Sequence, residues 1–318
     1  MVSVVLPNYN HEAYLEERIQ SILNQTYQDF ELILLDDCST DNSRIILQKY
    51  RNHPKVTACI FNTINSGSTF VQWEKGISEA SGEYIWLAES DDYADTMFLE
   101  SIVAVMSKDK QITLGYCQSS IVDEHSNFVK SNKEWTDNLD VQLWSSDFVL
   151  NGNSFISKYL FKKNVIPNAS AVVFRRDAMN LPSEVKKMRM AGDWLAIAKI
   201  IQDKKICFVS EELNYFRSSP NNTRIHKGGK RIRRFKEGFQ QINYFYANDM
   251  ISLKQFLWRR NDDLTKWYTV QSSLPPMEIK SLGVIVGSVA AAQQIQFHLT
   301  FLVHSVLKRV KGKLKIHG

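Results

Sequence analysis

Cysteine is scarce in this chain of 318 residues, and the few cysteines are not arranged to bind a metal. No pair of them has the CxxC spacing, which argues against a structural zinc site, and their scattered positions give no disulfide framework. We therefore expect reduced thiols and a cytoplasmic protein. The cysteines are Cys38, Cys59, Cys117 and Cys207.

A secretory signal and a strong excess of one charge are also missing. Residues 2–6 (VSVVL) predict a strand at once, without the basic start and long apolar core of a signal peptide. The net charge is only +5, and part of it comes from a basic run at residues 226–237. That run lacks the interleaved aromatic side chains of a nucleic-acid site, so we expect no nucleic-acid partner.

Short apolar runs alternate with helical patterns through the first half of the chain. The runs are rich in β-branched, aromatic and aliphatic residues, which is typical of buried parallel strands. The alternation predicts an α/β fold, with a Rossmann-like, mostly parallel sheet flanked by helices and right-handed crossovers. The expected strands are residues 2–6, 31–35, 56–61, 83–88, 112–117, 171–174 and 206–209, and the expected helices lie near residues 15–23, 45–50, 68–80, 98–106 and 194–201.

The second half is less regular. Periodicity fades between residues 122 and 168, which predicts an irregular or partly helical insertion over the sheet edge. Near Pro220 the composition changes, and helical patterns follow the basic run. We therefore expect two domains, an α/β domain at residues 1–219 and a C-terminal helical extension at residues 220–318.

The C-terminal extension contains a long uncharged stretch. Residues 282–307 carry no formally charged side chain, and several Lys and Arg residues follow them. The length is sufficient to span a bilayer, but the Gln and His side chains inside it would need polar partners in hydrocarbon. We expect an amphipathic helix instead. Two placements stay open: docking on protein, or peripheral contact with the cytoplasmic face of an anionic membrane.

Two pairs of adjacent aspartates stand close after expected strands. They are Asp36 with Asp37, and Asp91 with Asp92. Because open α/β sheets bind ligands in the crevice at the carboxyl ends of their strands, we expect both pairs in one site. Two like-charged pairs repel each other unless a cation or hydrogen-bond donors lie between them. The sequence therefore predicts a nucleotide and a divalent metal in one crevice.

An ordered set of motifs runs through residues 2–217. The motifs are VSVVLPNYN (residues 2–10), SILNQTY (21–27), ELILLDDCSTDNS (31–43), NSG (65–67), GEYIWLAESDD (82–92) and GDW (192–194). In this order they resemble the family-2 glycosyltransferases of the GT-A fold. The resemblance implies inverting transfer of a sugar from a nucleotide-diphospho-sugar, with a UDP-sugar as the default. The implied acceptor is a saccharide or lipid-linked saccharide of a surface polysaccharide.

The resemblance implies a donor site at the ends of the first two strands. Pro7, Tyr9 and Asn10 would touch the base and ribose, and Tyr9 can stack on a pyrimidine. Asp37 would accept hydrogen bonds from the base, a task suited to a carboxylate because it only accepts. Asn65 would contribute to the same donor site. A turn with a packed aromatic ring is the structural alternative for the first segment.

The acidic residues 89–92 stand at the place of the family's metal-binding motif. Asp91 and Asp92 are the expected ligands of Mn²⁺ or Mg²⁺, with Asp92 as the first candidate for direct coordination and Asp91 also near the donor. A hard cation held by carboxylates stabilises the charge that grows on a departing diphosphate. Glu89 stands where many relatives carry Asp. The alternative is a solvated acidic turn that caps the next helix.

Two further residues take roles from the resemblance. Asp193 is the candidate general base, because an inverting transfer needs one carboxylate to take the proton of the acceptor hydroxyl. As the residue before an apolar helix, it is equally suited to be a plain N-cap. Arg217 is placed to pair with the diphosphate through its planar guanidinium, and an ordinary surface arginine is its alternative.

One segment departs from the family's pattern. Many relatives show Arg-Asn-x-Gly where this chain has residues 73–76 (WEKG), so the cation near the donor is missing there, although Lys75 is adjacent. The departure leaves the donor sugar undetermined. Two other functions stay open: a non-catalytic sugar-nucleotide or glycan-binding module, and a sugar nucleotidyltransferase. The latter needs a Gly-rich phosphate loop, which residues 7–10 do not supply.

Overall fold

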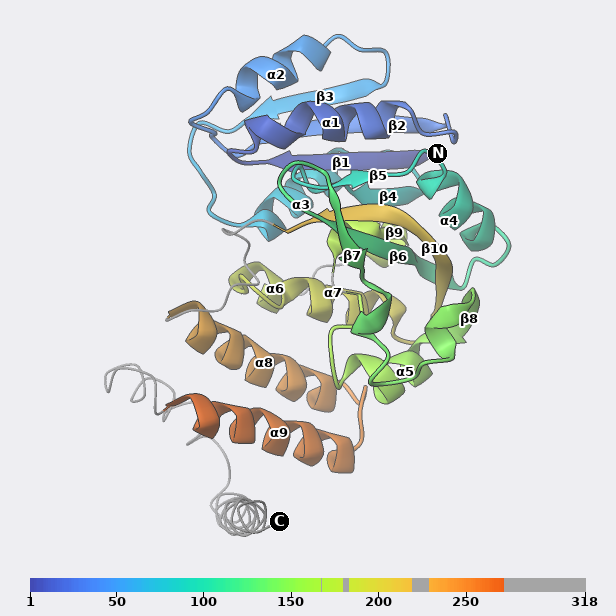
Figure 1. Cartoon of the computed structure of the whole chain (residues 1–318), viewed down its shortest axis with the longest axis vertical. Helices are drawn as coiled ribbons and strands as arrows, with labels where there is room; N and C mark the ends of the chain where they lie inside the picture. The colour runs from blue at the N-terminus through green and yellow to red at the C-terminus, as the bar shows by residue number, and fades with distance from the viewer. Residues whose placement is uncertain (167, 180–182, 219–228, 272–318) are drawn as a thin grey trace. The chain divides into compact units, whose positions relative to one another are not determined.

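The computed structural model of the chain describes residues 1–166, 168–179, 183–218 and 229–271 (Figure 1). The chain divides into two compact units, Met1–Asn222 and Thr223–Gly318. The strands of the first unit are β1 (Val2–Asn8), β2 (Phe30–Asp36), β3 (Val56–Phe61), β4 (Tyr84–Leu87), β5 (Tyr93–Ala94), β6 (Ile112–Val122), β7 (Phe128–Ser131), β8 (Phe148–Asn151), β9 (Val172–Arg175) and β10 (Lys205–Arg217). Its α-helices are α1 (Glu12–Leu23), α2 (Ser43–Tyr50), α3 (Thr69–Glu79), α4 (Phe98–Met106), α5 (Gly152–Phe155), α6 (Ser183–Lys187) and α7 (Gly192–Ile201).

The strands form one sheet in the order β3-β2-β1-β4-β9-β6-β10-β5, with β7 on β6 and β8 on β10. β1, β2, β3 and β4 are parallel to one another, and β10 is parallel to β6. β9 is antiparallel to both of its neighbours, β4 and β6, so β6 and β10 run in the same direction as β1. The predicted α/β fold with a mostly parallel sheet is confirmed. The simple βαβ order ends at β4, because β9 enters between β4 and β6 from a later part of the chain.

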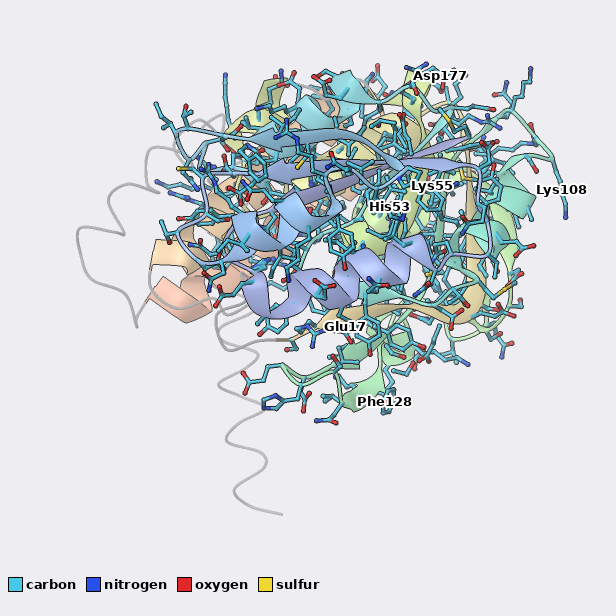
Figure 2. The ribbon with its side chains drawn as sticks, turned by 90° about the horizontal axis from the view of Figure 1, so that it is seen from above. Glu17, His53, Lys55, Lys108, Phe128 and Asp177 are labelled. Carbon is cyan, nitrogen blue, oxygen red and sulfur yellow. The ribbon has the colours of Figure 1, made fainter. Side chains whose placement is uncertain are left out.

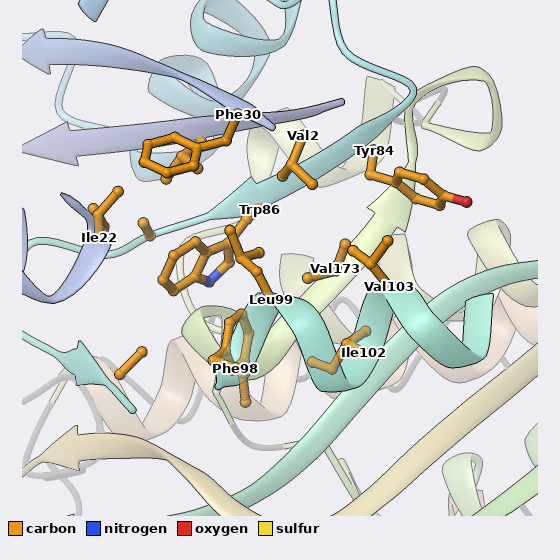
Figure 3. Close-up of a cluster of buried hydrophobic side chains, with 14 of the residues drawn as sticks. Val2, Ile22, Phe30, Tyr84, Trp86, Phe98, Leu99, Ile102, Val103 and Val173 are labelled. Atoms are coloured by element: carbon orange, nitrogen blue, oxygen red, sulfur yellow. The ribbon is translucent and has the colours of Figure 1, made fainter. Parts of the chain in front are cut away.

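Helices cover both faces of the sheet. On one face α1 and α4 bury a cluster of apolar side chains against β1, β2 and β4 (Figure 3). Trp86 of β4 lies at its centre, with its ring centroid 4.5 Å from that of Phe98. On the other face α3 packs close to β1, because a Cβ at Gly76 would come within 2.2 Å of Val5 Cγ1. Since α3 connects parallel strands, its first turns lie near their carboxyl ends.

The described part of the second unit consists of α8 (Gly229–Ala247) and α9 (Leu253–Gln271). The two helices meet where Tyr246 stacks on Phe256, with ring centroids 4.7 Å apart. Within the described residues, no helix combines the length and apolar character that crossing a bilayer requires. The predicted amphipathic segment at residues 282–307 lies outside the described residues.

Candidate active site

Asp36 and Asp37 end β2, next to the end of β1. Asp36 is fully buried and receives hydrogen bonds from Arg44 Nε at 2.8 Å, Ser39 N at 3.0 Å and Asn8 Nδ2 at 3.1 Å. A buried carboxyl group that accepts from a cation and two further donors holds its surroundings in place. Asp36 therefore fixes the loop after β2 against β1.

Asp37 is held by donors from the next loop and from α3. Its Oδ1 accepts from Asn62 Nδ2 at 2.7 Å, Ser66 N at 2.9 Å and Gln72 Nε2 at 2.9 Å. Its Oδ2 accepts from Ser66 Oγ at 2.7 Å, and its carbonyl oxygen accepts from Asn65 Nδ2 at 2.9 Å. Because a carboxylate offers about four acceptor positions, Oδ2 keeps room for a further donor. Its predicted contact with a base remains a prediction.

The segment after β1 is partly open to solvent. Pro7 pairs with Leu35 inside the sheet, whereas the side chain of Tyr9 is 46% exposed. Asn10 has a left-handed backbone with φ of 56°, and its Oδ1 accepts from Thr40 N at 2.8 Å. This contact ties the two loops at the ends of β1 and β2 together. The exposed Tyr9 ring is therefore available for stacking on a planar ligand.

The acidic turn after β4 carries three carboxyl groups with perturbed acidity. Burial raises the pKa of Glu89 to about 8, with repulsion from Asp91 as the next cause. Burial also raises the pKa of Asp92 to about 6, again with repulsion from Asp91. Trp73 Nε1 donates a hydrogen bond to Glu89 Oε1 at 2.6 Å. The turn thus brings together carboxyl groups whose ionised forms are disfavoured by burial and by one another, as in many functional sites.

Asp91 and Asp92 suit a hard divalent cation for which the protein supplies only some of the ligands. Among the described residues there is no group of three or more His, Cys, Asp or Glu side chains arranged as a metal site. Such ions are often bound by one or two carboxylates, with waters and substrate phosphates as the other ligands. Asp92 is only 2% exposed and its Oδ1 accepts from Arg217 N at 2.9 Å, whereas Asp91 is partly exposed. Exposure therefore favours Asp91 over Asp92 for direct coordination.

Arg217 lies behind the acidic turn, with its side chain 1% exposed. Its guanidinium donates to the carbonyl oxygen of Asp91 at 2.8 Å, to that of Asp123 at 3.0 Å and to Glu17 Oε2 at 2.5 Å. Glu17 is on the side of α1 that meets the loop between β6 and β7, where Ser126 Oγ donates to it at 2.9 Å (Figure 2). Arg217 is therefore a buried side chain that holds together the acidic turn, α1 and the loop between β6 and β7. Its pairing with a diphosphate remains a prediction.

Asp193 lies in the first turn of α7, close to α3. Asn164 Nδ2 donates to its Oδ2 at 3.2 Å. A Cβ at the preceding Gly192 would come within 2.6 Å of the Phe70 ring, so the start of α7 packs tightly on α3. A small, mainly apolar pocket has both Asp193 and Trp73 in its wall. The candidate base therefore shares a pocket with the residue that binds Glu89.

Helix α3 joins the regions that carry the predicted acids. Residues 70–73 pack against the start of α7, bind Asp37 and bind the acidic turn. The segments of Asp37, Asp92 and Asp193 are far apart in the sequence, and the structure brings all three to the first turns of this helix. The polar side chains of α3 were missed in the sequence, because a polar residue in a helix is ordinarily taken as surface.

Two residues of the α1 region also face the acidic turn and were missed. His11 Nδ1 lies 2.8 Å from Ser90 Oγ, within the turn itself. Arg18 is fully buried over the ring of Trp86, which precedes the turn. For Arg18 a signal was present, since it falls on the same helical face as Leu15 and Ile22. A charged residue on an apolar helical face indicates a buried charge.

The comparisons with known proteins agree with this geometry. The model of the family described as "Glycosyl transferase family 2" matches residues 3–178, more than half of the chain. The chain belongs to glycosyltransferase family 2. The predicted membership in this family and the predicted enzyme class are thereby confirmed. A curated relative, the poly(ribitol-phosphate) beta-glucosyltransferase of Bacillus spizizenii, is 32% identical over 202 residues, which cover 61% of this chain and 31% of that protein.

Solved structures of glycosyltransferases share the fold. TarS 1–349 of Staphylococcus aureus, in complex with UDP-GlcNAc, has a TM-score of 0.58 at 19% identity, covering 76% of this chain and 66% of that one. The mannosyltransferase PcManGT of Pyrobaculum calidifontis, in complex with GDP-Man and Mn²⁺, has a TM-score of 0.53 at 15% identity, covering 97% and 86%. The predicted GT-A-type fold is confirmed. Matches to the first curated relatives span about a third of their length, between 31% and 38%.

Proposed function

We propose that this family-2 glycosyltransferase is inverting and metal-dependent, and that it moves a sugar from a UDP-sugar to a glycan or lipid-linked glycan. The observation that carries the proposal is the meeting of three acidic segments at the first turns of α3. The segment of Asp37 would bind the nucleotide, that of Asp92 would bind the diphosphate through a metal ion, and that of Asp193 would bind the acceptor hydroxyl. Residues 1–219 would form the transferase domain and residues 220–318 an extension that contacts protein or the membrane face.

Donor binding would begin at the ends of β1 and β2. Tyr9 would stack on the base and Asp37 would accept from it, with Asn10, Asn65 and Pro7 shaping the loops around them. The complex of TarS with UDP-GlcNAc supports a UDP-sugar as the donor. The name of the Bacillus spizizenii relative, a poly(ribitol-phosphate) beta-glucosyltransferase, supports a polymer as the acceptor.

Asp91 and Asp92 would hold Mn²⁺ or Mg²⁺, and the Mn²⁺ in the PcManGT complex supports this choice. When bound, such an ion stabilises the negative charge on the diphosphate oxygens. The chain's own task is to present the carboxylates. Arg217 contributes by donating its backbone N–H to Asp92, which fixes one oxygen and its orientation.

Asp193 would act as the general base. The acceptor hydroxyl oxygen forms the new bond to the anomeric carbon, from the face opposite the diphosphate. The old carbon–oxygen bond breaks, its electron pair leaves with the nucleoside diphosphate, and the hydroxyl proton passes to Asp193. The bond from Asn164 Nδ2 orients this carboxylate. Attack from the far face inverts the anomeric configuration.

The test is release of nucleoside diphosphate from a panel of nucleotide sugars and glycan acceptors, with Mn²⁺ or Mg²⁺. Asp193→Asn should lower kcat by roughly 10²–10⁴-fold, the usual worth of a general base, while donor binding persists. Asp177→Asn, at an exposed position (Figure 2), is the matched control and should keep full activity. An Asp193→Asn protein as active as wild type would refute the base assignment. Tight nucleotide binding without turnover across the panel would instead indicate a non-catalytic binding module.

A further inference from the structure

Arg18 is a buried arginine that has no hydrogen-bond partner among the described residues. Its side chain is 0% exposed on the sheet-facing side of α1. Its Nε, Nη1 and Nη2 atoms are buried and bond to nothing in the described part of the chain. The guanidinium carbon lies 4.7 Å from the centre of the Trp86 ring. Buried arginines normally satisfy their donors with carboxylates or carbonyls, so this one requires a physical explanation.

The surroundings of Arg18 supply that explanation. Trp86, on which it stacks, lies in β4, directly before the acidic turn Glu89 to Asp92. Burial lowers the pKa of Arg18 to about 10, and attraction to Asp92, Glu89 and Asp91 opposes the shift. The side chain therefore remains a cation at neutral pH. A buried cation without hydrogen bonds is costly unless opposite charge lies close by.

Arg217 is a second cation near the turn, and its positive charge attracts Asp91. The guanidinium of Arg217 binds Glu17 and two carbonyl oxygens, and its contact with Asp92 is through the backbone N–H. Trp73 gives Glu89 a neutral N–H donor. Arg18 is thus a positive charge that faces the carboxylates of the turn without being hydrogen-bonded to any of them.

We propose that Arg18 is a built-in counter-cation of the acidic turn, a positioning residue that keeps its carboxylates together and weakens their hold on a divalent cation before the donor arrives. The second part rests on the metal role proposed above. Arg18 and the metal ion attract the same carboxylates and repel each other, so the charge of Arg18 lowers the affinity of the site for the metal ion. Without hydrogen bonds to break, the guanidinium leaves the carboxylate oxygens open for the ion and for the diphosphate.

A double-mutant cycle tests the counter-cation without any metal. Urea unfolding in EDTA is measured for wild type, Arg18→Met, Asp92→Asn and the double variant. Arg18→Met keeps much of the apolar volume and leaves the carboxylates uncompensated, and Asp92→Asn should relieve part of that repulsion. The unfolding constant of the double variant should therefore be about tenfold below the value that independent effects would give. Independent effects would overturn the proposal.

Arg175 is the matched control. It is also a buried arginine over an aromatic ring of β4, 4.9 Å from the centre of Tyr84. Its guanidinium, however, is satisfied by the carbonyl oxygens of Ile112 at 3.0 Å and Met106 at 2.9 Å. Arg175→Met should destabilise the protein and combine independently with Asp92→Asn.

The competition is tested by Mn²⁺ binding to the full chain without nucleotide, measured from the electron paramagnetic resonance signal of free Mn²⁺. Arg18→Met should bind Mn²⁺ about tenfold more tightly, whereas Arg18→Lys, which keeps the charge, and Arg175→Met should bind as wild type does. A merely structural role would not tighten binding, so unchanged or weaker binding by folded Arg18→Met would overturn the proposed competition. If Arg18→Met does not fold, Arg18→Gln, which also removes the charge, takes its place in both measurements with the same expected and contradicting outcomes.

The two proposals fail in different ways. A wild-type protein that binds no Mn²⁺, with coupling still present in the cycle, would refute the metal role and support Arg18 as the counter-cation. Mn²⁺ binding that Asp91→Asn abolishes, with no coupling in the cycle, would support the metal role and refute the counter-cation.

Discussion

Glu89 should make the metal-free protein less stable as the pH rises. Burial raises its pKa from an ordinary value of 4.5 to about 8. Between these two values the folded protein keeps a proton that the unfolded chain has lost. The stability that this proton contributes is complete below about pH 4.5 and is lost as the pH rises through about 8.

The size of the loss follows from linkage. Between pH 6.5 and 8.0 the carboxyl group is ionised throughout in the unfolded chain, whereas in the folded protein it goes from almost fully protonated to half protonated. The free energy of unfolding should fall by about 1.5 kcal/mol over this interval. His11 has a pKa that burial lowers from 6.5, so its effect has the opposite sign, offsets at most about 0.4 kcal/mol above pH 6.5, and cancels when wild type is compared with Glu89→Gln. Asp92, with a pKa of about 6, is largely ionised above pH 6.5 and adds little.

Urea unfolding in EDTA at pH 6.5 and 8.0 measures this loss. Wild type should lose about 1.5 kcal/mol more than Glu89→Gln over the interval, because the glutamine cannot ionise but still accepts from Trp73. Glu74→Gln, at an exposed position of α3, should retain the wild-type dependence. If wild type and Glu89→Gln showed the same change, the buried and protonated state of Glu89 would be wrong.

Two other substitutions test how the site is held. Gly192→Ala places a methyl group against the Phe70 ring and should cost about 1–3 kcal/mol in urea unfolding, with a loss of kcat as Asp193 moves. Gly238→Ala, where the nearest atom to the new Cβ is Asp263 Oδ2 at an ordinary contact distance of 4.0 Å, should be neutral or stabilising. Equal results for the two would contradict the tight packing at Gly192. Arg217→Met should cost about 3–5 kcal/mol, because it removes a buried and fully bonded guanidinium. A variant of Arg217 with normal stability but weak donor binding would instead support a direct contact with the diphosphate.

Most of the fold was predictable because the pattern of apolar residues along the sequence indicates which segments are buried. The apolar runs at residues 2–6, 31–35, 56–61 and 83–88 lie in β1, β2, β3 and β4, since a strand covered on both faces must be apolar throughout. The position of β9 beside β4 and its antiparallel direction were not predictable. Periodicity shows that a segment is a strand but carries no information on its neighbours or its direction.

The site was predictable where polar residues close an apolar run, and not where they lie inside a helix. Asp37 and Asp91 were proposed because open α/β sheets bind ligands at the carboxyl ends of their strands. The donors that hold them, such as Gln72, have the composition of ordinary helix surface. Trp73 was noted only as a departure from the family's pattern. Its hydrogen bond to Glu89 depends on how closely α3 approaches the sheet, and that distance cannot be read from the residue pattern of a single sequence.

That approach shows what the first turn of α3 contacts where the family's pattern has Arg and this chain has Trp73. Gly76 lets the helix lie directly on β1, and one turn earlier Gln72 and Trp73 reach acids that end two different strands. Because a helical turn is stiff, a displacement that breaks one of these contacts strains the other. An indole N–H at this point holds Glu89 without adding charge that would repel a metal ion. In the proposal made above, Arg18 on the opposite face of the sheet adds positive charge that attracts the acidic turn but occupies none of the carboxylate oxygens.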